Sequence, residues 1–238
     1  MMNGQSKLML DQEFEIKFSL SSLKFLTYVG VFASLTVITC NTIMFSFGDT
    51  ANWPQWALNL SYWAGSMVLA FAALGFIPTY FALRSAGRFW VLASGGFLAY
   101  FLALGSSGHG SFFANYSIQQ AIQNAPSIKE LDALAVPLQT YNSFLLFAAV
   151  TFLFLGSVFY CITILTRKTM YPRWMALSNP FLIVVIVSVP AMIEGVPNIV
   201  KIVSKGIGFH LGFIIHYILT YHFIRSYFVK FSDEDIRE

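Results

Sequence analysis

The residues in this sequence whose types and positions could do chemistry lie at the ends of long apolar runs. There are four of them, two acids and two histidines: Asp49, His109, Glu194 and His210. Carboxylates and imidazoles bind divalent metals and transfer protons near neutral pH. Ionisable groups are costly to place in an apolar environment, so their presence there indicates a function. The pattern predicts one polar site to which four different helices contribute.

Two kinds of chemistry are open to this set. His109, His210 and Asp49 could bind a divalent metal such as zinc, which would activate a water molecule. Alternatively, all four residues could act as catalytic acids and bases without a metal. Each residue also has a purely structural interpretation, because a helix cap, a solvated turn or an ion pair accounts equally well for an Asp, a His or a Glu.

The last apolar run contains three of the four histidines, at intervals of six residues: His210, His216 and His222. Six residues of α-helix turn through about 600°, so successive rings point about 120° away from one another and cannot bind one ion together. At most one of them faces the predicted site. His210 is that residue because its depth matches that of His109, whereas His216 is expected in a supporting role and His222 near the membrane interface.

Composition places the elements that position these residues in a membrane. Of 238 residues, 57% are hydrophobic and 11% are charged, which excludes an ordinary soluble domain and a disordered chain. Six apolar stretches are long enough to cross a hydrocarbon layer of about 30 Å. They cover approximately residues 25–47, 61–83, 89–107, 141–166, 175–193 and 207–227. Because no alternating strand pattern occurs, we predict an all-α polytopic membrane protein with one transmembrane domain, a bundle of six helices.

The basic residues predict the orientation of this bundle. Eleven of the fourteen lie before the first run, after the last run or in alternate loops between them. The other three lie on the opposite side: Lys129, Lys201 and Lys205. The positive-inside rule therefore predicts that both termini are cytoplasmic, with cytoplasmic segments at 1–22 and 228–238 and an uncleaved first span. The basic residues form no continuous patch, which excludes nucleic acid as a partner.

Two further stretches bear on the predicted site. The outer loop 108–140 contains two short amphipathic helical patterns, at 116–124 and 128–136, which would either cover the site as a lid or lie in the interface plane. Pro190 and Pro197 bracket Glu194. They predict either a broken helix that lines a cavity or a plain helix end followed by proline.

Three short motifs resemble those of a known group of proteins. Gly48-Asp49, His109-Gly110 and the run from Thr169 to Trp174, in this order, resemble a family of uncharacterised bacterial multi-pass membrane proteins. The resemblance covers most of the chain. It implies the bacterial inner (plasma) membrane and no particular activity.

The membrane metallohydrolases that include alkaline ceramidases and adiponectin receptors offer only a chemical likeness. They bind zinc through Ser-x-x-x-His on one helix, an Asp on another and His-x-x-x-His on the last of seven spans. Here Gly105 stands four residues before His109, where those enzymes have serine, and the last run lacks His-x-x-x-His.

The leading hypothesis is a membrane-embedded enzyme, metal-assisted or acid/base, that acts on a lipid or other apolar substrate in a pocket of the outer leaflet. The alternative is a non-enzymatic, proton-coupled carrier or binding protein for an apolar or weakly acidic solute. A third hypothesis is an accessory protein whose outer loop meets a partner. The expected partners are membrane lipids and an apolar small molecule, while the sequence predicts no oligomeric state.

Overall fold

The computed structural model describes residues 18–48, 53–125 and 129–234, which contain helices and short connections and no strand. The helices are α2 (Leu20–Phe45), α3 (Gln55–Trp63), η2 (Ala64–Val68), α4 (Leu69–Ala72), η3 (Ala73–Gly75), α5 (Phe76–Leu83), η4 (Arg84–Ala86), α6 (Arg88–Asn124), α7 (Lys129–Thr166), η5 (Arg173–Ser178), α8 (Pro180–Met192) and α9 (Asn198–Glu234). The segments from α3 to η4 follow one another directly as a single apolar rod, Gln55–Ala86.

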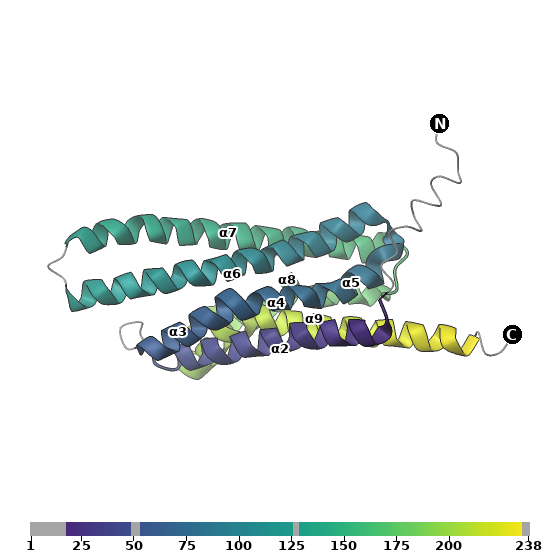
Figure 1. Cartoon of the computed structure of the whole chain (residues 1–238), viewed down its shortest axis with the longest axis horizontal. Helices are drawn as coiled ribbons and strands as arrows, with labels where there is room; N and C mark the ends of the chain where they lie inside the picture. The colour runs from purple at the N-terminus through teal and green to yellow at the C-terminus, as the bar shows by residue number, and fades with distance from the viewer. Residues whose placement is uncertain (1–17, 49–52, 126–128, 235–238) are drawn as a thin grey trace, which may run out of the picture.

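The long helices lie side by side and alternate in direction along the chain (Figure 1). The most extensive contacts are between α6 and α7, between α2 and α9, and between α8 and α9. Because the helices alternate in direction, the start of α2 and the end of α9 lie at the same end of the bundle (Figure 1). We call this end the basic end, because the basic side chains that the structure describes lie toward it: Lys24, Arg84, Arg88, Arg167, Lys168, Arg173 and Arg225. The opposite end is the far end.

Among the described residues, four helices are long and apolar enough to cross a membrane: Leu20–Phe45, Gln55–Ala86, Arg88–Asn124 and Glu130–Thr166. They correspond to the first four apolar runs of the sequence. The fifth run makes a shorter helix than predicted, because its first residues belong to η5 and α8 has only 13 residues. At 1.5 Å per residue α8 is about 20 Å long. The sixth run lies in α9, which has 37 residues but is not among these four.

The outer loop predicted at 108–140 takes a different form. Residues up to Asn124 continue α6, and residues from Lys129 onward belong to α7, so the two predicted short helices extend the long ones instead of standing apart. This hairpin projects beyond the other helices at the far end (Figure 1). The predicted start of the second short helix, at 126–128, lies outside the described residues. Pro137 is accommodated inside α7 without ending it.

The outward faces of the helices carry large apolar side chains. Phe32 on α2 is 71% exposed and Phe147 on α7 is 73% exposed. Exposed apolar side chains in such number are unusual for a protein surrounded by water and are typical of one surrounded by lipid. The arrangement is that of an integral membrane protein.

The connection between α7 and α8 contains the motif from Thr169 to Trp174 and is held by hydrogen bonds. The Tyr171 hydroxyl lies 2.7 Å from Oγ1 of Thr220 on α9. The Arg173 guanidinium donates to the carbonyl of Ile164 near the end of α7. Burial raises the pKa of the Tyr171 hydroxyl, which therefore stays protonated at neutral pH. These contacts give the motif a structural role at the basic end.

Candidate functional site

A cavity of about 280 Å³ lies between the helices, toward the far end of the bundle. Its walls come from α2, α3, α4, α6, α7 and α9, and none of the described residues that line it is Asp, Glu, Lys or Arg. Most of them are apolar or aromatic. The polar or ionisable side chains among them are Asn41, Ser61, Tyr62, His109, Tyr116 and His210.

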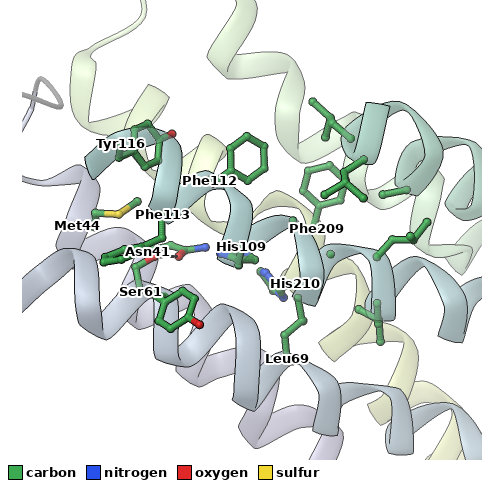
Figure 2. Close-up of a pocket in the computed structure, with 18 of the residues that line it drawn as sticks. Asn41, Met44, Ser61, Leu69, His109, Phe112, Phe113, Tyr116, Phe209 and His210 are labelled. Carbon is green, nitrogen blue, oxygen red and sulfur yellow. Dashed lines mark hydrogen bonds between the residues drawn. The ribbon is translucent and has the colours of Figure 1, made fainter. Parts of the chain in front are cut away.

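His109 on α6 and His210 on α9 both line this cavity, and Figure 2 shows their rings next to each other. His210 is only 6% exposed, and its Nδ1 atom has no hydrogen-bond partner. Buried polar atoms in folded proteins are almost always paired, so an unpaired ring nitrogen beside a cavity indicates a ligand or a water molecule there.

Gly65, on a neighbouring helix, leaves the space that the ring of His109 occupies. A Cβ atom added to Gly65 would lie 2.1 Å from Cγ of His109, a distance that real Cβ atoms do not show. Only a residue without a side chain fits at this position. Gly65 belongs to η2, a π-helix, and π-helical turns inside α-helices are frequent at functional sites. The Ser106 hydroxyl donates to the carbonyl of Ser66 and joins α6 to η2 one turn before His109.

A second polar pair lies in the wall formed by α2 and α3. The Ser61 hydroxyl donates to Oδ1 of Asn41 over 2.9 Å, and both residues are buried. This bond leaves the two N–H groups of the Asn41 amide as donors on the side of the cavity. The cavity therefore presents an amide and two imidazoles among largely apolar walls.

Aromatic rings pack beside the cavity near its far end. Tyr116 of α6 lines it and packs edge-on against Trp53, with 4.7 Å between the ring centroids. The Trp53 indole donates to the carbonyl of Gly48 over 2.9 Å, and the Gln120 amide donates to the carbonyl of Trp53 over 2.9 Å. These contacts tie the extension of α6 to the start of α3.

The structure does not bring the other two predicted site residues to the cavity among the residues it describes. Asp49 lies outside the described residues. Glu194 lies in the turn between α8 and α9, where its side chain is exposed and does not line the cavity. The prolines around it mark helix boundaries, since Pro190 lies in the last turn of α8 and Pro197 directly precedes α9. Of the three predicted site residues that the structure describes, it brings together His109 and His210 and not Glu194.

The three histidines of α9 have three different surroundings, as their spacing predicts. His216 is fully buried and lies outside the cavity, with its Nε2 atom 2.8 Å from the hydroxyl of Thr79 on α5. His222 is exposed and packs edge-on against Phe223. His216 therefore makes no contact with the cavity that would give it the predicted supporting role.

The described residues do not form a zinc site. Among them no group of three or more His, Cys, Asp or Glu side chains could hold a metal ion. A catalytic zinc ordinarily takes three protein ligands, and His109 and His210 supply two. Acid/base and hydrogen-bond chemistry is what this pair can provide on its own.

A pair of imidazoles in an apolar cavity has defined chemical abilities. A neutral imidazole has one N–H donor and one acceptor nitrogen, so two of them can donate to and accept from the same polar group. Hydrogen bonds are stronger where water is scarce, because the local dielectric is low. The pair can therefore hold the polar group of an apolar molecule, and each ring can give up or take a proton there.

Three residues of the site were not among those predicted from the sequence: Asn41, Ser61 and Gly65. Asn41 did carry a signal, because it is an amide inside an apolar run, where polar side chains are costly. The roles of Ser61 and Gly65 depend on which helix faces they occupy, and the sequence alone does not show this.

Comparison of the chain with protein-family models, with curated proteins and with solved structures finds no match.

Proposed function

We propose that the chain is a six-span protein of the bacterial inner membrane that takes an apolar substrate from the lipid into this cavity. His109 and His210 bind the polar group of that substrate and act on it as acid and base. The observation that carries the proposal is the position of two imidazoles, from two different helices, beside one cavity whose described lining holds no charged side chain, with the Nδ1 atom of His210 unpaired.

The distribution of charge supports the proposed orientation. The described basic side chains lie toward one end of the bundle, which also holds the start of α2 and the end of α9. By the positive-inside rule this end is cytoplasmic, and so are both termini. α8 and α9 complete the six spans, α8 as a short one. The cavity then belongs to the outer half of the membrane.

The rim of the cavity supports entry from the lipid. Tyr62 on α3 is 39% exposed and Leu146 on α7 is 50% exposed, and both line the cavity. The cavity therefore reaches the apolar outer surface of the bundle. An apolar substrate can enter there without passing through water.

The chemistry follows from the two rings. One imidazole, in its neutral form, accepts a proton from the substrate, while the other donates an N–H hydrogen bond to the oxygen that gains negative charge. The Nδ1 atom of His210 is available for this task, because it has no hydrogen-bond partner among the described residues, and His109 lines the same cavity. The carrier alternative uses the same acids and histidines as proton-coupling groups, and Glu194, one of these acids, is exposed and does not line the cavity.

The test uses purified protein in lipid nanodiscs that contain a total bacterial lipid extract. We expect wild-type protein to convert one apolar component of the extract, seen by mass spectrometry as a loss of that component and a gain of product. His109→Gln and His210→Gln should abolish the conversion and leave the fold intact. His222→Gln is the matched control, because His222 lies on the same helix as His210 but is exposed outside the cavity. Unchanged lipid composition with wild-type protein, or equal conversion by all variants, would refute the proposal.

A further inference from the structure

The properties of the cavity narrow the class of substrate, on the premise of the proposed function. We infer that the cavity binds the ring of an isoprenoid quinone or quinol, that is, an uncharged flat ring with carbonyl or hydroxyl oxygens and an apolar tail. Four features lead to this class: the charge of the walls, the volume, the aromatic lining and the donors and acceptors that the walls offer.

The walls select an uncharged head group. Since none of the described lining residues is Asp, Glu, Lys or Arg, a phosphate or carboxylate would meet no counter-charge among them. Burial of an unpaired charge in apolar surroundings is strongly unfavourable. A carbonyl or hydroxyl oxygen is therefore favoured over a phospholipid head group.

The volume accommodates a single ring. At about 30 Å³ for each water molecule in the liquid, 280 Å³ corresponds to about nine waters, or a group of about ten non-hydrogen atoms. This matches a substituted six-membered ring with two oxygens. A porphyrin or a complete diacyl lipid is several times larger. The rest of a long apolar molecule can extend past the exposed rim at Tyr62 and Leu146 into the lipid.

The lining suits a flat ligand. Several aromatic side chains surround the histidines, from both α6 and α9: Phe101, Phe112, Phe113, Tyr116 and Phe209. Figure 2 shows Phe112, Phe113 and Phe209 around the two imidazoles. Aromatic rings pack favourably against other flat rings in offset or edge-on arrangements, beyond the gain from burial alone.

The polar groups suit both redox forms of such a ring. A quinone carbonyl accepts hydrogen bonds, and an imidazole N–H and the Asn41 amide can donate them. A quinol hydroxyl donates, and an imidazole nitrogen can accept, since each neutral ring carries one atom of each kind. The unpaired Nδ1 of His210 meets either need according to its tautomer. The inference concerns binding and includes no electron transfer.

The experiment measures binding of three probes to the full-length protein in nanodiscs, by equilibrium dialysis against empty nanodiscs. The probes are ubiquinone-1, decanoic acid and 1-decanol, which represent a ring carbonyl, a carboxylate and a hydroxyl without a ring. We expect saturable binding of ubiquinone-1 alone, with Kd raised at least about tenfold in His109→Leu and in His210→Leu, because each variant loses a buried hydrogen bond. His222→Leu should bind like wild type.

A thermal melting curve of each variant identifies any that fails to fold. If His109→Leu or His210→Leu fails to fold, binding is measured with the single variants His210→Gln and Asn41→Leu. Binding of decanoic acid or 1-decanol that depends on the histidines, without binding of ubiquinone-1, would overturn the quinone inference and leave the proposed function standing. Equal binding of ubiquinone-1 by all variants would show partition into lipid and overturn the inference. No saturable binding of any probe would overturn both.

Discussion

The substitution Gly65→Ala tests how the site is built. The new Cβ atom would lie 2.1 Å from Cγ of His109, 2.2 Å from its Nδ1 and 2.5 Å from its Cβ. Ordinary contact begins at 3.4 Å, so the ring must withdraw by about 1.3 Å. Rotation of the ring does not relieve the clash, because the Cβ atom of His109 is itself too close. The backbone of α6 or of η2 has to move.

The expected effect on stability combines two terms. Insertion of a methyl group into a packed site costs about 1 to 3 kcal/mol. Alanine in place of glycine in a helix offsets about 0.5 to 1 kcal/mol of this cost. The net loss is then about 0 to 2.5 kcal/mol. The effect on function is larger, since a displacement of about 1 Å at a catalytic group can cost about a hundredfold in rate.

The assay compares Gly65→Ala with Gly96→Ala. Gly96 is also helical, but a Cβ atom there meets no other atom within 4 Å. We expect Gly65→Ala to lower the lipid-conversion rate and the affinity for ubiquinone-1 at least about tenfold while most of the protein remains folded, and Gly96→Ala to behave like wild type. If the two variants have the same rate, affinity and melting temperature, the close contact between Gly65 and His109 does not exist as described.

Three other substitutions test two packing and hydrogen-bond contacts of the bundle and the predicted role of Glu194. Gly75→Ala should destabilise the bundle by about 1 to 3 kcal/mol in denaturant unfolding, because the new Cβ would lie 2.7 Å from Cζ of the buried Tyr217. Tyr171→Phe removes the hydroxyl bound to Thr220, and the loss should be about 1 to 2 kcal/mol in the same measurement. Glu194→Gln should leave the conversion rate and ubiquinone-1 binding unchanged, because this exposed side chain does not line the cavity.

Matched variants serve as controls for these substitutions. Gly96→Ala is the control for Gly75→Ala, and Tyr141→Phe, at a tyrosine that is 52% exposed, is the control for Tyr171→Phe. A substitution that unfolds at the same denaturant concentration as its control would show that the contact in question contributes nothing. A Glu194→Gln variant that loses conversion would place this residue in the site after all.

Much of the helical arrangement could be predicted, because apolar length and basic loops are local properties of the sequence. The ends of α6 and α7 could not. The third apolar run ends at 107, yet α6 continues through Gly108 and Gly110, and a Cβ atom added at Gly110 would lie 3.5 Å from Cε2 of Tyr62. A glycine in a membrane helix allows close packing between helices as readily as it ends one.

The candidate site could be predicted in part. His109 and His210 stand at ends of apolar runs that reach a matching depth, and the structure brings both to one cavity. Glu194 satisfies the same criterion but falls in a turn, because α8 ends after Met192 and the chain reverses through Gly195. The contribution of Gly65 arises from the contact between two helices, which no single run of sequence contains.

The central claim is that His109 and His210 lie next to each other beside one cavity (Figure 2), and cysteine cross-linking tests it most directly. In a background with Cys40→Ala and Cys161→Ala, the pair His109→Cys and His210→Cys is treated with a short membrane-permeable bifunctional thiosulfonate. We predict an intramolecular cross-link between α6 and α9, detected by mass spectrometry after proteolysis, and none for the control pair His109→Cys and His216→Cys. No cross-link at 109 and 210, or equal cross-linking of both pairs, would contradict the claim.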